Sequence, residues 1–386
     1  MAHSREEDQD RGRHRRWRRW ARLVLGALAL AAALVCPAGG YAAPELRRIK
    51  VEGITLTYPV ELEAEAQAVA RQIPDTLVPA RETCLRVRRA FVGGTAARAI
   101  GKRLGCSLSG ATPRAWASAL GGVADAAASP FERVRLFSES EVQAAGGLQP
   151  GGLTVTRKMG RDTLTFTLSW GTRRPLAGQR PEKRPILAIV AGTDLSPYRE
   201  FAKTLPALFF HEMAEFALVA EKVTGYAFYY PSSRWFNEGV ATWVALQVVE
   251  DLMPDLSEAC RAALLPDEGE TALRNDVNLL TWRQNSYQDS PDPWVSSPEV
   301  IRAHYLCAAE TVERILRGQP PGTLPAVLGR LKKEEVPDNR TICRVVREVT
   351  GVDALAILRE YSNVWPAVTR VLVPDAWDLK DAPSPP

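Results

Sequence analysis

Two short motifs constrain the fold of this chain more than any other feature of its sequence. The first is HEMAE, in which His211 and Glu215 are four residues apart. Residues at this spacing lie on one face of an α-helix, so both side chains can point at one common atom. The second is NEG, which places Glu238 near the start of another predicted helix, 23 positions after Glu215. If this helix returns antiparallel to the first, the three side chains meet between the two helices.

The three residue types are ones that hold a metal ion. An imidazole and two carboxylates can bind a divalent cation in a three-ligand site that keeps a further position open. Glu212 lies beside His211 at the edge of the same helix face, where it could reach a metal-bound water as general base. The spacing therefore predicts one divalent metal on His211, Glu215 and Glu238, with Glu212 as the catalytic residue.

The motifs resemble those of a known family, the gluzincin (peptidase-MA-like) zinc metallopeptidases. Their signature is HExxH on one helix and a glutamate on the next, often within NEG, which WFNEGVATW matches closely. The segments HYLCAAETVERIL and REVTGVDALAILREY also resemble the helical tail of small secreted peptidase-MA-like proteins. The resemblance covers residues 48–361, and its specific part is the two short motifs. It implies a zincin-like fold, peptide-bond hydrolysis by a metal-activated water, metal ligands at His211 and Glu238, and Glu212 as the base.

The sequence departs from the family at one ligand. Glu215 stands where the family has its second histidine. An anionic ligand makes the metal a weaker Lewis acid and should raise the pKa of its water. We expect slower hydrolysis, a higher pH optimum, or manganese in place of the expected zinc. The alternative is a catalytically inactive pseudopeptidase that holds no metal and acts as a binding module in the cell envelope.

Two further residues are auxiliary candidates. His304 and Tyr305 lie on a predicted helix over residues 298–316. His304 could supply the missing imidazole if the fold brings it near the other ligands. Tyr305 could stabilise an oxyanion, a role that a tyrosine on this helix has in some relatives. Core packing is the alternative explanation for both side chains.

The N-terminus predicts export. A segment rich in arginine is followed by the apolar run LVLGALALAAALV and by small residues, the order of a secretory signal peptide. We expect residues 1–42 to be the signal, with cleavage after Ala42, and the mature protein to be periplasmic or extracellular. The alternatives are a twin-arginine signal, a lipid on Cys36, or an uncleaved anchor.

Charge restricts the partners. Residues 1–42 carry eight arginines and four acidic residues, which accounts for the whole formal net charge of +4. The remainder has no basic excess to attract a phosphate backbone, so nucleic-acid binding has no electrostatic support and we expect no such partner. We expect a peptide or protein as substrate or ligand, and contact with a membrane only through the export signal.

Export also permits disulfides. Five cysteines follow the predicted signal, and two of them, Cys84 and Cys106, bracket a short glycine-rich loop that a disulfide could close. Two of the other three could also pair. Because the five lack close CxxC spacing, they do not predict a structural metal site.

Periodicity predicts an α+β protein, with an N-terminal mixed sheet and helices followed by an all-helical C-terminal region. We divide the chain into an N-terminal α+β region (43–195), a helical region that carries HEMAE and NEG (196–374) and a disordered tail (375–386). Predicted strands cover 48–58, 131–137, 153–159, 163–170 and 186–191. Predicted helices cover 61–73, ended by Pro74; parts of 82–129; 196 onward, with a new start at 204–206 and a stop at Gly225; then 237–252, 298–316, 341–349 and 352–361.

Overall fold

The computed structural model describes residues 45–144, 148–159, 162–175, 186–221, 223, 233–265, 277, 279–282, 298–334 and 337–361. The predicted signal peptide with its cleavage site, Cys36, the helix stop at Gly225 and the predicted C-terminal tail lie outside these residues. No helix of the described part is long and apolar enough to cross a membrane.

Four strands form a mixed sheet in the order β1 (Leu46–Val51), β2 (Ile54–Pro59), β3 (Arg133–Phe137) and β6 (Leu187–Val190). The pair β1–β2 is antiparallel, whereas β2–β3 and β3–β6 are parallel. The single strand predicted over 48–58 is therefore wrong, because the chain reverses there. The turn residues Glu52 (φ 45°) and Gly53 (φ 80°) both have positive φ, the backbone that a tight two-residue hairpin requires.

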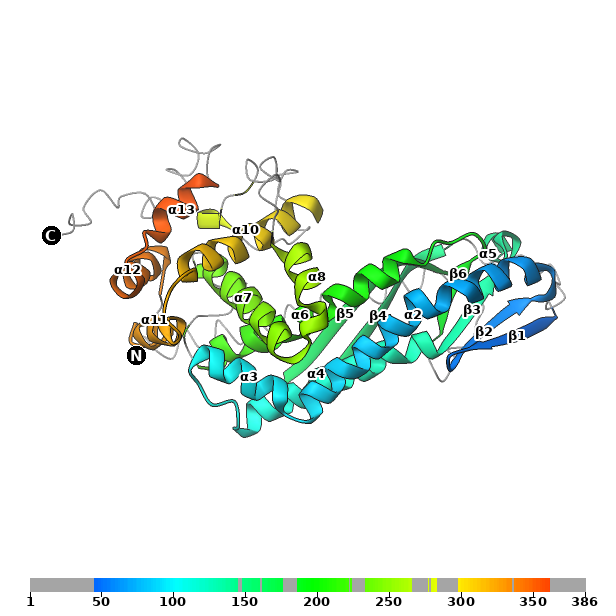
Figure 1. The fold of residues 1–386 in the computed structure, drawn as a ribbon, viewed down its shortest axis with the longest axis horizontal. Helices are drawn as coiled ribbons and strands as arrows, with labels where there is room; N and C mark the ends of the chain where they lie inside the picture. The colour runs from blue at the N-terminus through cyan, green and yellow to red at the C-terminus, as the bar shows by residue number, and fades with distance from the viewer. Residues whose placement is uncertain are drawn as a thin grey trace, which may run out of the picture.

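A second, two-stranded sheet consists of the hairpin β4 (Leu148–Met159) and β5 (Asp162–Pro175). Its strands confirm the predicted runs 153–159 and 163–170 and extend beyond them. The hairpin contacts α4 (Ala111–Ala128) and α6 (Ser196–Ala220). It lies along these helices between the four-stranded sheet and the helical end (Figure 1).

In helix α2 (Glu63–Val92), burial of apolar side chains outweighs the tendency of proline to end a helix. The predicted stop at Pro74 is wrong, because the helix continues through both Pro74 and Pro79. A proline inside a helix removes one hydrogen bond and crowds the preceding turn. Apolar residues on both sides of the prolines, Ile73 and Leu77 among them, are fully buried in the core. Packing of this long apolar face keeps the helix intact.

Helix α6 repeats this behaviour. Its predicted start at Ser196 is confirmed, but the second start predicted at 204–206 is wrong, since Pro206 lies inside one continuous helix. The consequence for the site is direct. His211 and Glu215 lie on a long helix that is anchored in the core on either side of them.

Helix α7 (Arg234–Leu252) is the centre of the helical region, and most of its residues are buried. It packs against α6 and α10 (Pro298–Leu316). A Cβ added to Gly239 would lie 2.4 Å from the backbone oxygen of Ala308, so the glycine of NEG permits the close approach of α7 to α10. The remaining helices are α3 (Thr95–Leu104), α5 (Glu139–Ala144), α8 (Pro254–Leu264), α11 (Thr323–Leu331), α12 (Asn339–Thr350) and α13 (Ala354–Glu360), with the 3-10 helices η1 (Val60–Leu62), η2 (Ser129–Glu132) and η4 (Leu279–Thr281).

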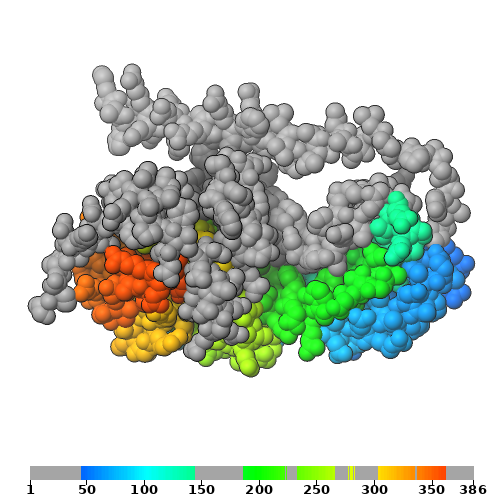
Figure 2. Space-filling view, turned by 90° about the horizontal axis from the view of Figure 1, so that it is seen from above, coloured from blue at the N-terminus to red at the C-terminus, as the bar shows by residue number. Residues whose placement is uncertain are grey.

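The molecule is elongated, with the four-stranded sheet at one end, α10 to α13 at the other, and α2 and α6 running between them (Figure 1). From a perpendicular direction, the green α6 again lies between the blue N-terminal and the orange C-terminal elements (Figure 2). One hydrophobic core includes buried residues from both regions and crosses the predicted division at residue 195. The α+β prediction, with a mixed sheet followed by a mainly helical remainder, is confirmed.

The predicted disulfides are not formed. Cys84 and Cys106, like the other three cysteines of the described residues, are free thiols. Burial raises the pKa of Cys84 and of Cys343 to about 12, which keeps both thiols protonated and unreactive at neutral pH. These cysteines therefore serve as small apolar core residues.

Candidate metal centre

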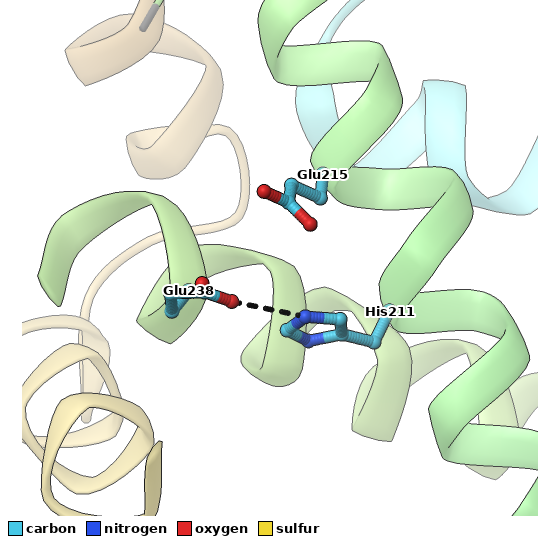
Figure 3. A group of neighbouring side chains, drawn as sticks. All are labelled: His211, Glu215 and Glu238. Carbon is cyan, nitrogen blue, oxygen red and sulfur yellow. Dashed lines mark ion pairs between the residues drawn. The ribbon is translucent and has the colours of Figure 1, made fainter. Parts of the chain in front are cut away.

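The crossing of α6 and α7 brings together the three predicted ligands. His211 and Glu215 project from α6 toward Glu238 on α7 (Figure 3). One ligand atom from each of the three lies within 4.8 Å of the other two. Nε2 of His211 is 3.2 Å from Oε2 of Glu238. The described residues contain no other such group of three histidine, cysteine or acidic side chains.

One pair of donor atoms has the spacing of two ligands on a small divalent cation. Zinc ligands lie at 2.0–2.2 Å from the metal, so neighbouring ligand atoms of a tetrahedral ion are about 3.3 Å apart. The separation of 3.2 Å between His211 and Glu238 matches this value. The side chains of His211 and Glu238 are 12% and 3% exposed, so the site is largely shielded from water. Imidazole nitrogen and carboxylate oxygen are donors that both zinc and manganese accept.

Two polar side chains of α7, those of Thr242 and Asn237, contact His211 and Glu215 and orient them. Nδ1 of His211 lies 3.1 Å from Oγ1 of Thr242, which directs the other ring nitrogen, Nε2, toward Glu238. Asn237 donates a hydrogen bond from Nδ2 to Oε1 of Glu215, at 3.1 Å. Contacts of this kind fix the orientation of metal ligands. The two motifs do not predict these roles, although Asn237 belongs to NEG and Thr242 follows Glu238 by one helical turn.

Arg234 is a buried cation at the edge of the site. It is 1% exposed, and its Nε donates to Oε1 of Glu238 at 3.4 Å. Its Nη2 donates to the hydroxyl of Tyr305 at 3.2 Å, and its guanidinium carbon lies 4.2 Å from the centre of the Trp282 ring. The role of Arg234 does not follow from the motifs either. The signal that could have indicated it is the i, i+4 spacing of Arg234 and Glu238 on a mostly apolar helix.

The carboxylates create an excess of negative charge. Burial disfavours a charged imidazole, but the hydrogen bond and charge of Glu238 outweigh it and raise the pKa of His211 to about 9. Burial, together with the charge of Glu238, raises the pKa of Glu215 to about 7. The raised pKa of His211 means that the carboxylates around it favour a positive charge at this place. A divalent cation would supply it and would compete with protons for the same atoms.

Glu212 lies beside the three ligands and is available for chemistry. Burial raises the pKa of its carboxyl, and the charges of His211 and Glu238 act on it as well. No hydrogen bond or ion pair joins its carboxylate to another described residue. Its side chain is partly buried, and a carboxylate in such a place without a partner is costly for stability.

The two auxiliary candidates have different positions. The ring of His304 is buried 5.3 Å from that of Trp282, and His304 is not in the ligand group, so it does not replace the missing imidazole. The ring of Tyr305 is 6.4 Å from that of His211, beside the site. Burial and the charge of Glu238 raise the pKa of Tyr305, so its hydroxyl keeps its proton.

Comparison with protein-family models, with curated proteins and with solved structures finds no match to this chain. The functional assignment therefore rests on the donor atoms and on the residues that surround them. The gluzincin resemblance stays a prediction made from two motifs. The geometry adds that three ligand atoms from these motifs converge between two buried helices.

Proposed function

We propose that this protein is an exported metal-dependent peptide hydrolase of the gluzincin type, with a zincin-like fold and an atypical ligand set. The observation that carries the proposal is the convergence of His211, Glu215 and Glu238, whose ligand atoms lie within 4.8 Å of one another. Export rests on the signal-like sequence of residues 1–42, and peptide as substrate rests on the motif resemblance.

The surroundings of the cluster support hydrolysis. A bound divalent cation would polarise a peptide carbonyl and acidify a water molecule. Glu212 offers a carboxylate without a hydrogen-bond partner among the described residues, so it can take the proton of the attacking water. The Tyr305 hydroxyl accepts a hydrogen bond from Arg234 and has its own proton left for a developing negative charge.

The ligand set bears on the choice of metal. One imidazole and two carboxylates form a harder donor set than two imidazoles and one carboxylate. Carboxylate oxygen suits manganese better than it suits softer metals, whereas imidazole suits zinc. We propose zinc, with manganese as the alternative that the second carboxylate favours.

The first experiment measures metal content. The protein is purified without chelators or a histidine tag, and bound metal is determined by plasma mass spectrometry for the parent, Glu238→Ala and Glu212→Gln. We expect about one equivalent in the parent, none in Glu238→Ala, and a full equivalent in Glu212→Gln. A screen of peptide substrates then compares the parent with Glu212→Gln. No stoichiometric metal after incubation with zinc and with manganese would contradict the proposal.

One observation favours a second function, a pseudopeptidase that binds a peptide or protein in the same site. The ion pair of His211 with Glu238 satisfies both side chains directly, and Glu215 has the amide of Asn237 as its partner. Such a site is stable without catalysis. In this case Glu212→Gln would leave ligand binding and every cellular effect unchanged, whereas a peptidase would lose its effect with the same substitution.

A further inference from the structure

Tyr305 has a hydroxyl proton with no acceptor among the described residues. Its oxygen accepts a hydrogen bond from Nη2 of Arg234 at 3.2 Å, because an arginine can only donate. A phenol has one proton of its own, and this proton has no contact in the part of the chain that the structure describes. The side chain is only partly buried, and its ring lies 6.4 Å from the ring of His211. The hydroxyl is therefore a spare donor beside the candidate metal centre.

One guanidinium joins this hydroxyl to a predicted metal ligand. Nε of Arg234 donates to Oε1 of Glu238 at 3.4 Å, while Nη2 donates to Tyr305. A guanidinium is planar and rigid, so it makes its two contacts at a fixed separation. Arg234 is 1% exposed, and its side chain stays charged at every accessible pH. The position of the Tyr305 hydroxyl is thereby tied to that of Glu238.

Trp282 limits the movement of both partners. The centre of its ring lies 4.2 Å from the guanidinium carbon of Arg234. It also lies 4.9 Å from the ring of Tyr305, to which it is perpendicular. The residues before Trp282 are anchored in turn, because Nδ2 of the buried Asn339 donates to the backbone oxygen of Leu280 at 3.0 Å. These contacts leave the arginine and the tyrosine little room to change orientation.

A charged donor changes what the hydroxyl can do. A hydrogen bond from a cation is stronger than one from a neutral group, and linked hydrogen bonds polarise one another. The contact with Arg234 therefore makes the remaining proton of Tyr305 a stronger donor. Donors that are fixed before the reaction and meet a developing negative charge in a shielded site stabilise the transition state.

We propose that Arg234 is a positioning residue that acts through Tyr305, holding its hydroxyl to donate to the substrate oxygen on which negative charge develops. The inference rests on the proposed hydrolysis and assigns a role in it to a residue outside HEMAE and NEG. It makes a specific claim: Arg234 contributes to kcat through the Tyr305 hydroxyl. A role in packing against Trp282 alone would affect kcat equally with and without that hydroxyl.

A double-mutant cycle on kcat tests the claim. A peptide that the parent cleaves is given to the parent, Arg234→Met, Tyr305→Phe and the double variant, each loaded with zinc. The rates are expressed per bound metal, because Arg234 also contacts Glu238. We expect Tyr305→Phe to lower kcat about 10²-fold and to change KM by less than about twofold. Arg234→Met should lower kcat about 10-fold in the parent and only about twofold in the Tyr305→Phe background.

A second cycle measures the contact without metal or substrate. The midpoint of thermal unfolding is determined in EDTA for the same four proteins. Arg234→Met should lower it by about 10 °C in the parent, because Glu238 stays buried without its cation. Tyr305→Phe should lower it by about 4 °C in the parent, where it removes a hydrogen bond to a charged donor, and by less in the Arg234→Met background. If Arg234→Met does not fold, Arg234→Lys replaces it in both cycles, since lysine keeps the charge but not the planar pair of donors.

Each outcome decides the matter. Losses that are coupled in both cycles support the inference. Losses of kcat that add, or a parental kcat in Tyr305→Phe, overturn it and leave Arg234 a packing residue. Unfolding costs that add show that the contact is not formed in solution, which also overturns it. No hydrolysis by the parent removes the proposed function together with this inference, whereas additive losses in an active parent remove the inference alone.

Discussion

Two regions of the molecule contain clusters of paired charged side chains, and the clusters differ in how far they are exposed to water. On the exposed surface of α12, Arg344 pairs with Glu334, which follows α11, and with Glu348, at 2.8 and 3.0 Å. The side chains of Arg344, Glu334 and Glu348 are 47%, 36% and 38% exposed. Between α6 and α7, Arg234 and Glu238 are 2% and 3% exposed. Exposed pairs contribute about 0–1 kcal/mol each, whereas breaking a buried pair costs about 3–5 kcal/mol.

Charges in contact with water and charges buried between helices have different effects on stability. Water already solvates the exposed charges of Arg344, Glu334 and Glu348, so their pairing contributes little to the fold. The charges between α6 and α7 replace apolar packing at the centre of the helical region, where hydrophobic side chains of similar size would be equally stable or more so. The buried cluster therefore supports the proposal that this site carries out chemistry or binds a ligand.

The largest expected effect is on catalysis, from Glu212→Gln. Removing the general base should lower the rate of peptide hydrolysis by about 10²–10⁴-fold, while the three ligands keep the metal. The measurement is kcat/KM on a cleaved peptide together with metal content. Glu348→Gln, on the exposed α12 surface, is the matched control and should keep the parent rate. An unchanged rate in Glu212→Gln would remove this residue from the mechanism.

Glu238→Ala should have the largest effect on the fold. It removes one metal ligand and leaves Arg234 buried without its carboxylate, at a cost of about 3–5 kcal/mol. We expect loss of the metal and a fall of about 10 °C in the unfolding midpoint, measured by calorimetry. Glu348→Ala removes a carboxylate of the exposed network instead and should shift the midpoint by less than about 3 °C. Equal shifts would mean that burial does not distinguish the regions.

The pH dependence of stability should also differ between the regions. The pKa of Glu215 is raised from 4.5 to about 7, and that of His211 from 6.5 to about 9. The folded protein therefore binds these protons more tightly than the unfolded chain. Their contribution is present at low pH and is lost as pH rises, through about 7 for Glu215 and through about 9 for His211.

We expect the unfolding midpoint in EDTA to fall between pH 6 and pH 9 by more in the parent than in Glu215→Gln. Adding zinc or manganese should reduce this fall, because the cation competes with the protons and binds more tightly as pH rises. Calorimetry across this range, with and without metal, is the measurement. Parallel curves for the parent and Glu215→Gln would show that Glu215 does not titrate here.

The sequence allowed the ligands to be predicted but not their supports, for a physical reason. The spacing of His211 and Glu215 fixes their common helix face, and helix geometry alone places them together. The contacts of Arg234, Asn237 and Thr242 depend on how α6, α7 and α10 cross, which no local pattern specifies.

The fold shows the same limit. The helix predicted over 298–316 matches α10 because its start and its apolar period agree. The stops predicted at Pro74 and Pro206 fail because burial of long apolar faces outweighs a local break. The predicted disulfide between Cys84 and Cys106 is not formed, and both residues are free thiols. Their short separation along the chain does not determine how their side chains pack.

The smallest expected effect comes from Arg344→Met, the surface counterpart of Arg234→Met. Arg344 pairs with the exposed carboxylates of Glu334 and Glu348, whereas Arg234→Met removes buried contacts with Glu238, Tyr305 and Trp282. The two substitutions therefore differ above all in the burial of the contacts that they break. Because the partners of Arg344 are exposed, we expect a fall of at most about 3 °C in the unfolding midpoint. Salt at about 1 M should abolish that fall, since it screens exposed charges over a few ångströms, and should leave the larger loss in Arg234→Met nearly unchanged.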